Sequence, residues 1–582
     1  MKRNLLFMPV LASLFLAGCS QEDIAPDEGA NGNGEAITSY MAVNLVSSDV
    51  LGTRATGNGY EDGTTDENSV SKVRFYFFDG TGGIVNVKPK ASGAVNYYDW
   101  ENPTTGSSNP NDVEKILSTT IVINTKKGDG LPVRIAAVIN PDNVTGLGTT
   151  SLSLSSLKDI AQDYAASSLT SNGNFVMFNS VYLDGGKGYS TTDIKIANIC
   201  TTEALALANP VDIYVERSVA KVSVALGNNV SAAASTGGKI VLKDKVTGGE
   251  NILVEGKQVY LQLLGWELAA ETDKGRLVKK INPGWEGDWW KGNAHRTFWA
   301  INYMSASNVY DKDYNDISTN FSTDETTYYL YTNENAGKND IDNTAGSAQE
   351  DTKVIVKGKL VNEDGEAFTI VRHGGARFAD APDTFLKLRE SVLRMLENKE
   401  YFYYYKGEDN AFHQIAATDL TVVEPTLVTN EDSKSNCYVY TQLTETAESK
   451  NWYKTTTKAN ESTAETAYTS IQASEINNTL ANKKTGSTTD YIIDRPLVWK
   501  SGMTYYYYPI IHNGSGTTAT KGVVRNHIYQ TTIDNIAGLG TPVYNPGTTI
   551  YPEKPDPNDH YIAARINILS WRVVSNGYNL EW

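Results

Sequence analysis

Cysteine is scarce in this sequence, which has three cysteines, Cys19, Cys200 and Cys437, among 582 residues. No CxxC pair or other metal-ligand spacing occurs, which excludes a cysteine-based zinc site and a dense disulfide framework. Cys200 and Cys437 either form one disulfide or stay as two separate buried thiols, and we favour the second arrangement. The fold must therefore draw its stability from packed secondary structure.

Clusters of positive charge are also missing. The chain has 51 Lys and Arg against 68 Asp and Glu, a net charge of −17, and the basic residues gather nowhere. Proteins that bind nucleic acids gain affinity by neutralising phosphates with basic patches. We therefore expect no nucleic acid among its partners.

Catalytic signatures are absent as well. The six histidines are scattered, and none belongs to an HExxH motif or a close metal-binding pair. The stretch "GGKGYST" at 185–191 lacks the spacing of a phosphate-binding loop and indicates a hairpin turn instead. We predict that the protein is not an enzyme, has no catalytic residues and needs neither a metal ion nor a cofactor.

Apolar runs long enough to span a bilayer, about 18 residues, do not occur. The apolar stretch 5–16 follows two basic residues and is typical of a signal peptide. It ends in "LAGC", which resembles the bacterial lipobox. We expect residues 1–19 to be a lipoprotein signal peptide whose Cys19 carries the lipid; the alternative is an ordinary signal peptide with an incidental cysteine.

Tyrosine and small polar residues are abundant instead. The chain has 34 tyrosines against 14 phenylalanines, and tyrosine suits strands with one wet face. Strand-like runs recur between turn signals, among them "SKVRFYFFDG", "TTIVINT", "KQVYLQLLGWELA" and "TYYYYPIIH". The predicted fold class is mainly β with a few short helices, on an extracellular protein.

A strand near the amino terminus precedes a lone arginine. In "AITSYMAVNLV" the alternation predicts a half-buried strand, behind a polar tether at 20–35, with one apolar face made of Ile37, Met41, Val43 and Leu45. Arg54 follows in "SSDVLGTRATGNG", a Thr/Gly-rich flank that a protease can reach. We predict cleavage between Arg54 and Ala55, which separates the strand from the rest of the chain.

Three features predict the organisation downstream. The alternation of the long strand 209–226 slips near Arg217, which indicates a bulge, and we place the end of a first domain near Leu226. Helices are predicted around 155–168, with a serine cap at its start, and over 383–400. The polar stretch 441–490 is predicted to form exposed loops.

The carboxy terminus combines an extended linker with an apolar tail. Residues 540–560 are rich in Pro, Gly and Asp, and the strand-forming run 561–582 ends on Trp582. We expect 561–569 to pair within its own domain. The last part, about 571–582, alternates so that one face holds Val574, Tyr578, Leu580 and Trp582. An unpaired apolar strand needs a partner.

Taken in order, these motifs resemble the major fimbrillins of the type V pilus, closest to the short-fimbria (Mfa-type) subunits. The matching residues are the lipobox, the first strand with Arg54 and Ala55, "VRFYFFDGTG", "DIYVERSVAKV", "VIVKGKL", "GVVRNHIYQTTIDNIAGLGTPV" and "ILSWRVVSNGYNLEW". The resemblance implies two transthyretin-like β-sandwich domains in tandem. We place them at 55–226 and 227–582, after a propeptide at 20–54.

The same resemblance implies a life history. The subunit is exported through the periplasm to the outer membrane as a lipoprotein. An extracellular Arg-specific protease then removes the lipid and the first strand. Subunits polymerise by donor-strand exchange into a cell-surface fimbrium that supports adhesion and biofilm formation. The implied partners are other copies of the chain, anchor and tip subunits, the protease, and the outer membrane before processing.

Two alternatives stay open. A surface glycan-binding lipoprotein is suggested by the tryptophan-rich "WEGDWW" at 285–290 together with the lipobox; it would keep its lipid and first strand. A tip or anchor subunit of the same pilus is the other. A tip subunit has no need of an apolar donor tail, and an anchor would stay lipidated, so the tail and Arg54 argue against these roles.

Overall fold

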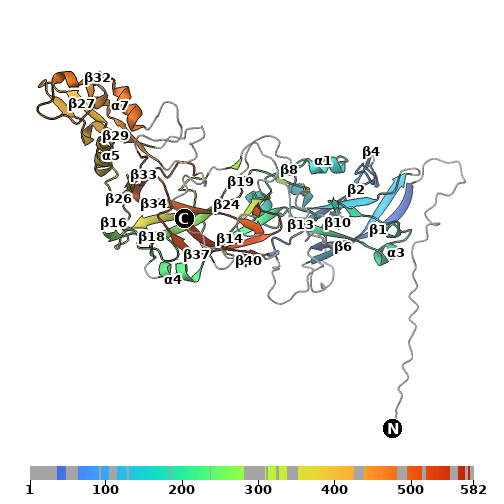
Figure 1. The fold of residues 1–582 in the computed structure, drawn as a ribbon. Coiled ribbons are helices and arrows are strands. Elements are labelled where there is room, and N and C mark those ends of the chain that lie inside the picture. Colours follow the sequence, from blue (N-terminus) through green and yellow to red (C-terminus); the bar gives the residue numbers. More distant parts are fainter. Residues whose placement is uncertain are drawn as a thin grey trace, which may run out of the picture. The chain divides into compact units, whose positions relative to one another are not determined.

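The structure is a computed structural model (Figure 1), and it describes residues 36–47, 63–90, 93–103, 115–126, 130–180, 182–184, 187–235, 238–280, 308–309, 312–322, 327–336, 351–424, 438–481, 494–513, 520–550, 561–569 and 575–576. In these residues the chain is mainly β with a few short helices, which confirms the predicted fold class. None of the described helices is both long enough and apolar enough to cross a membrane.

The described residues divide into two compact units. The chain passes from the first to the second between Ser218 and Val219, and the described residues 274–280 belong again to the first unit. The expected boundary was near Leu226. The difference arises because the long strand breaks in two: β13 (Val211–Arg217) pairs in the first unit, whereas β14 (Val219–Leu226) pairs with strands of the second. The slip in alternation near Arg217 therefore marks a change of sheet, not a bulge.

The first unit is built on an eight-stranded sheet. Its order is β5 (Tyr97–Glu101), β2 (Lys72–Phe78), β7 (Arg134–Ile139), β9 (Met177–Asn179), β13, β1 (Ala36–Ser47) and β6 (Lys115–Lys126), with β12 (Thr192–Asp193) beside β7. β2 is buried from Val73 to Phe78, with Val73, Phe75 and Phe77 on one face, while Arg74 on the other face pairs with Asp99. Neighbouring strands in space are distant in sequence, so the sheet depends on long-range pairing.

Short elements complete the first unit. They are β3 (Lys88–Lys90), β4 (Gly93–Val95), η2 (Pro141–Asn143), α1 (Leu154–Lys158), β8 (Ala161–Gln162), α2 (Ser167–Thr170), β10 (Tyr182–Asp184), β11 (Lys187–Tyr189), η3 (Ile196–Asn198), α3 (Glu203–Ala208) and β20 (Gly275–Arg276). The stretch "GGKGYST" contributes to the β10–β11 hairpin, as predicted. The single helix predicted around 155–168 is wrong. Ser153 caps a helix of five residues, and β8 then interrupts the helical pattern by pairing with β20.

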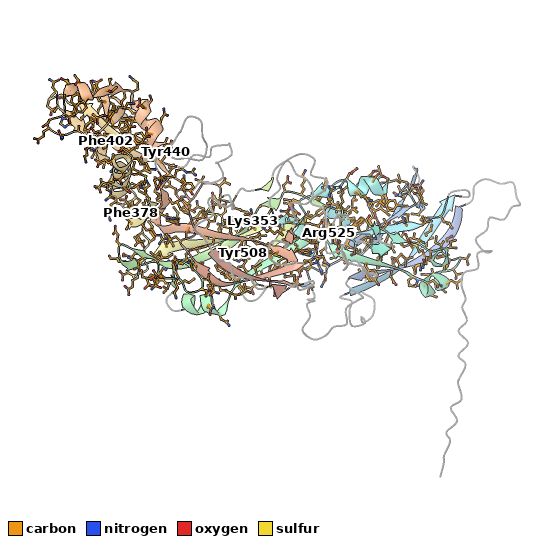
Figure 2. The ribbon with its side chains drawn as sticks, in the orientation of Figure 1. Lys353, Phe378, Phe402, Tyr440, Tyr508 and Arg525 are labelled. Carbon is orange, nitrogen blue, oxygen red and sulfur yellow. The ribbon has the colours of Figure 1, made fainter. Side chains whose placement is uncertain are left out.

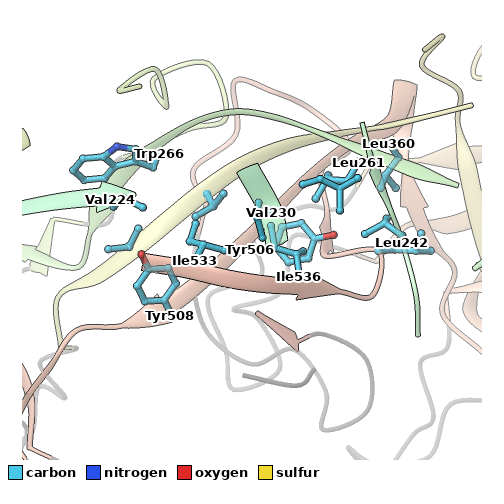
Figure 3. Packing of buried hydrophobic residues seen from close by; sticks show 14 of the residues in the cluster. Val224, Val230, Leu242, Leu261, Trp266, Leu360, Tyr506, Tyr508, Ile533 and Ile536 are labelled. Carbon is cyan, nitrogen blue, oxygen red and sulfur yellow. The ribbon is translucent and has the colours of Figure 1, made fainter. Parts of the chain in front are cut away.

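The second unit contains a β-sandwich. One sheet has the order β22 (Tyr329–Asn333), β14, β37 (Ile528–Ala537), β39 (Tyr561–Leu569) and β40 (Ser575–Asn576). The other has β15 (Ile240–Val241), β18 (Tyr260–Ala269), β24 (Lys353–Val361), β34 (Met503–Pro509) and β38 (Thr541–Pro542). Side chains from both sheets pack in one apolar cluster, with Val224 and Ile533 from the first and Trp266 and Tyr508 from the second (Figure 3).

An inserted lobe follows β26 (Ala376–Ala379) and ends before β33 (Leu497–Trp499), and both of these strands pair with β25 (Ile370–His373). It contains α5 (Leu386–Asn398), β27 (Phe402–Lys406), β28 (Phe412–Gln414), η6 (Ala417–Asp419), β29 (Leu420–Val423), β30 (Tyr440–Leu443), α6 (Glu445–Glu448), β31 (Trp452–Thr455), η7 (Glu465–Ala467), β32 (Thr469–Ile471) and α7 (Ala473–Leu480). Figure 2 shows Phe402 and Tyr440 among its side chains.

The described residues 441–481 of the lobe form short strands and helices around buried side chains, which overturns the prediction of exposed loops for that part of 441–490. Trp452, Ile471, Ile476 and Leu480 are buried there against the apolar face of α5. These few apolar residues are spaced among many Thr, Ser and Asn residues, so the local composition conceals them. The helix predicted over 383–400 forms as α5, and it buries the expected stripe through Leu388, Val392 and Leu396.

The remaining elements of the second unit are short. They are α4 (Asn228–Ser235), β16 (Leu253–Val254), β17 (Lys257–Gln258), β19 (Glu271–Thr272), β21 (Asn308–Val309), β23 (Asn335–Ala336), η8 (Lys500–Gly502), β35 (Ile511–Asn513) and β36 (Thr520–Val523). A buried ion pair joins Arg525, labelled in Figure 2, to Glu334 at 3.1 Å between Nε and Oε2. Both side chains are buried, and each charge is compensated by the other in the core.

Candidate strand-exchange site

The first strand, β1, lies inside its sheet, between β13 and β6. It pairs in parallel with β13, where Val43 is opposite Val211 and Leu45 is opposite Ile213. It pairs antiparallel with β6 along its whole length, from Ala36 to Ser47. Hydrogen bonds therefore hold β1 on both sides, and its departure would leave a slot between two strands instead of shortening a sheet at its edge.

The core-facing side of β1 carries Met41 and Val43, two of the four residues that the sequence predicts there. Met41 and Val43 are both fully buried, and Ser39 lies between apolar neighbours on the same face. The walls of the slot are equally apolar, with buried Leu117, Ile121 and Ile123 on β6 and Val211 and Ile213 on β13. Removal of β1 would thus expose a continuous hydrophobic surface.

The opposite side of β1 is less exposed than predicted. Ala42 belongs to this side and is buried in a small cluster with Cys200 and Ala206, where Tyr40 and Leu205 also pack. The backbones of Tyr40 and Cys200 exchange two hydrogen bonds of 2.8 Å. The short helix α3 covers this part of β1, which explains why the strand is buried on both faces there and not half-buried.

The chain downstream of Arg54 has its own attachment to the first unit. The Arg217 side chain at the end of β13 donates to the carbonyl oxygen of Glu67 at 3.0 Å, and it also bonds Asn68. The Asn140 amide donates to the carbonyl oxygen of Ser69 at 3.1 Å. These contacts do not involve β1, so a cut at Arg54 would leave β1 held by pairing and packing alone.

The charged residues of β13 lie at its far end and on its outer face. Glu216 and Lys279 form an ion pair of 3.1 Å with both side chains buried. Asp212 points outward and is exposed. Burial raises the pKa of the Tyr214 phenol, and the nearby Asp212 carboxylate acts in the same direction. The core-facing residues described on the two walls, Leu117, Ile121, Ile123, Val211 and Ile213, are all apolar.

The carboxy-terminal strands extend a sheet of the second unit. β39 pairs antiparallel with β37 along its length, as predicted for 561–569. β40 then folds back onto β39, with Asn576 opposite Ile566 and Ser575 opposite Asn567. β40 thus occupies the edge of its own sheet.

Several predicted site residues fall outside the described part of the chain. They are Cys19, Arg54 and Ala55, the donor residues Val574, Tyr578, Leu580 and Trp582, and the tryptophan-rich stretch 285–290. Ile37 and Leu45 are placed by their strand register, without a description of their side chains. The roles proposed for all these residues stay predictions.

The walls of the slot were not predicted. Cys200 was predicted as a buried thiol and is buried, but its place beside β1 was not predicted. The run "TTIVINT" predicts a strand at β6, and "VDIYV" predicts one at β13, so the elements were visible. Their pairing with β1 was not, because it joins residues more than 70 positions apart, such as Val43 and Thr119 or Val43 and Val211. Within the described ranges, no group of three or more His, Cys, Asp or Glu residues is arranged to hold a metal ion.

A family comparison places the carboxy-terminal part of the chain. Residues 498–577 match the family model described as major fimbrial subunit protein type IV, fimbrillin, C-terminal. The match includes β34, β37, β39 and β40. For this part of the chain, the match confirms the predicted resemblance to fimbrillins.

Comparison with solved structures gives distant likenesses. A putative cell adhesion protein of Bacteroides eggerthii has 11% identity and a TM-score of 0.32, with 94% of this chain and 98% of that chain covered. A fimbrilin (FimA) of Porphyromonas gingivalis has 12% identity and a TM-score of 0.33, with 92% and 98% covered. The tip fimbrial protein Mfa3 of Porphyromonas gingivalis, with a C-terminal truncation, has 12% identity and a TM-score of 0.29, with 92% and 100% covered. No curated protein matches.

Proposed function

We propose that the protein is a structural subunit of a cell-surface fimbria that polymerises by strand replacement. The subunit reaches the outer membrane as a lipoprotein anchored through Cys19. Cleavage between Arg54 and Ala55 by an extracellular Arg-specific protease frees β1 from the chain. The carboxy-terminal segment of another copy, about 571–582, then takes its place between β13 and β6.

The position of β1 is the observation that carries this proposal. A strand paired on one side could leave a sheet with little consequence, but β1 is paired on both sides and buried on both faces around Ala42. Each fully buried apolar side chain contributes about 1.5–3 kcal/mol. A vacant slot is therefore unstable in water, and replacement by another apolar strand regains both ladders and the core contacts.

The donor has the chemistry that the slot requires. Its predicted face of Val574, Tyr578, Leu580 and Trp582 alternates with polar residues, as does the face of β1 that carries Met41 and Val43. The fimbrillin match over 498–577 supports a subunit role for the part of the chain that ends near this segment. Adhesion and biofilm formation would follow from the assembled fibre.

The variant Arg54→Ala tests the activation step. We expect it to stay lipidated and membrane-bound with β1 in place, and to form no fibres, whereas wild-type fibres sheared from cells begin at Ala55. Arg54→Lys is the matched control, because it keeps the charge and removes the arginine that an Arg-specific protease recognises. Normal fibres from Arg54→Ala, or sheared subunits that begin at Cys19, would show that the proposal is wrong.

A further inference from the structure

The strand order of the first unit leaves β6 in an unusual position. Among the described strands, β6 pairs with β1 and with no other member of the sheet. Loss of β1 would therefore separate β6 from the sheet along its entire length, and the apolar face of β6 that carries Leu117, Ile121 and Ile123 would lose its neighbour. Without β1, β6 has no strand partner in the sheet among the described strands.

We propose that β6 closes the slot by pairing directly with β13 whenever β1 is absent, so that the processed subunit waits in a closed state. This inference rests on the proposed function, because it concerns the slot that β1 leaves. It adds a regulatory step: an incoming strand has to displace β6 from β13 before it can bind. Premature aggregation through an open hydrophobic slot is thereby prevented.

Strand direction permits this closure. β6 runs antiparallel to β1, and β1 runs parallel to β13, so β6 already runs antiparallel to β13. A sideways shift of about one strand spacing, roughly 4.8 Å, would bring the two backbones into hydrogen-bonding distance. No reversal of the chain is needed.

The register permits it as well. Val43 is opposite both Val211 and Thr119, and Leu45 is opposite both Ile213 and Leu117. A sideways shift without slippage would therefore pair Leu117 with Ile213. Residues directly opposite each other share a face, so the buried side chains of both strands would still point into the core. A slip of one residue would turn them outward, which fixes the expected register.

The outer face offers a second contact. Val122 is exposed on β6, and it is opposite Tyr40, which is also paired with Cys200. In the closed state Val122 would lie opposite Cys200 and lose exposure. Closure therefore predicts two new residue pairs from a single movement. Leu117 pairs with Ile213 on β13, and Val122 lies opposite Cys200.

Engineered cysteines distinguish the open slot from the closed one. In the precursor, positions 118 and 212 are both opposite Asn44, so two strand spacings, about 9.6 Å, separate them. Cysteines with Cα atoms more than about 7 Å apart do not form a disulfide. After closure, Ser118→Cys and Asp212→Cys would be directly opposite, within bonding distance. Cys200→Ser and Cys437→Ser in the same chain remove competing thiols.

The experiment uses the full chain with a sequence-specific protease site in place of residues 51–54. The folded protein is cut, the fragment that contains β1 is removed by gel filtration in dilute urea, and mass spectrometry records its loss. We expect the 118–212 disulfide to rise from background to most of the protein only after the fragment leaves. Asn44→Cys with Ser118→Cys is the matched control, and it should crosslink before the cut because these positions are already opposite.

A second pair keeps the test independent of one variant's folding. Val122→Cys with the native Cys200 should crosslink only after β1 has left. Release of the fragment without either crosslink overturns the inference.

Failure of the proposed function gives a different result. A synthetic peptide of residues 570–582 should bind the cut protein, lose that binding when the 118–212 disulfide is oxidised, and regain it on reduction. No binding to the cut protein without engineered cysteines would contradict strand replacement itself. Equal binding to the oxidised and reduced forms would contradict the inference that closure by β6 controls access.

Discussion

The buried pair of Glu216 and Lys279 is a sensitive point of the first unit. Both side chains are almost completely buried, and their charged atoms are 3.1 Å apart. Removing one partner of a buried ion pair costs about 3–5 kcal/mol, because the charge that remains loses its ion-pair partner. We therefore expect Lys279→Met to speed the hydrogen exchange of the β13 amides. The increase in exchange rate should correspond to most of the loss of about 3–5 kcal/mol.

Matched variants separate burial from charge. Glu216→Gln combined with Lys279→Met removes both charges and should recover much of the lost protection. Lys454→Met breaks an exposed pair with Glu475 and should cost less than about 1 kcal/mol. A loss of similar size in Lys279→Met and Lys454→Met would contradict the structural reading of the pair.

His373 gives the inserted lobe a predicted dependence on pH. It lies on β25, and its Nδ1 is 2.8 Å from the Ser391 hydroxyl on α5. Burial lowers the pKa of His373 below its usual value of 6.5. Below pH 6.5 the unfolded chain binds a proton that folded His373 does not, so stability falls as pH falls through this window.

We expect the lobe to open at a lower urea concentration at pH 5.5 than at pH 7.5, as followed by the fluorescence of the buried Trp452. His373→Gln should reduce this difference, because the variant has no group to protonate there. His413→Gln is the control, since His413 is on the solvent-accessible β28. An unchanged pH difference in His373→Gln would show that another group is responsible.

At the scale of elements, β1 should matter to the precursor and not to the mature fibre. Met41 is fully buried, and truncation of such a side chain to alanine costs about 2–5 kcal/mol. Met41→Ala should therefore lower the melting temperature of the uncleaved precursor. Fibres assembled from the same variant should be as stable as wild-type fibres, because the proposed cleavage removes β1.

Ile213→Ala is the matched control for that experiment. Ile213 is also fully buried, but it belongs to β13, which stays in the mature subunit. This variant should destabilise the precursor and the fibre alike. Fibres weakened by Met41→Ala would mean that β1 remains in them, contrary to the proposed replacement.

Local patterns predicted the elements better than their partners. The alternation around Met41 predicts β1, and the helical spacing of Leu388, Val392 and Leu396 predicts α5, because both signals lie within a few residues. The slip in alternation near Arg217 predicts a bulge, because a local pattern does not distinguish a bulge within one sheet from the passage of a strand to another sheet. For the site, β1 and its apolar face were predictable, while the walls of the slot depend on pairing over long sequence distances.

At the scale of the whole molecule, the proposed function gives the two ends of the chain complementary roles in assembly. A subunit that lacks 571–582 keeps a slot and has no donor. We expect it to fold, to be cleaved and to accept a strand, but to offer none in return. Added to wild-type subunits in rising proportion, it should shorten fibres progressively, as seen by electron microscopy.

A subunit with Arg54→Ala gives the opposite control, because its slot stays filled. It should be inert as an acceptor and should not shorten wild-type fibres when its own donor segment is also deleted. Equal shortening by both variants would indicate interference unrelated to the slot.

Crosslinking between subunits in the fibre tests strand replacement most directly. Leu580→Cys is introduced in one population of subunits, and Leu117→Cys or Ile213→Cys, on the core-facing walls of the slot, in a second population that carries a mass tag. Val122→Cys, on the outer face of β6, replaces them in the control. Strand replacement predicts disulfides between tagged and untagged subunits for the core-facing positions and none for Val122→Cys. Disulfides only within single chains, or none at the core-facing positions in fully assembled fibres, would contradict it.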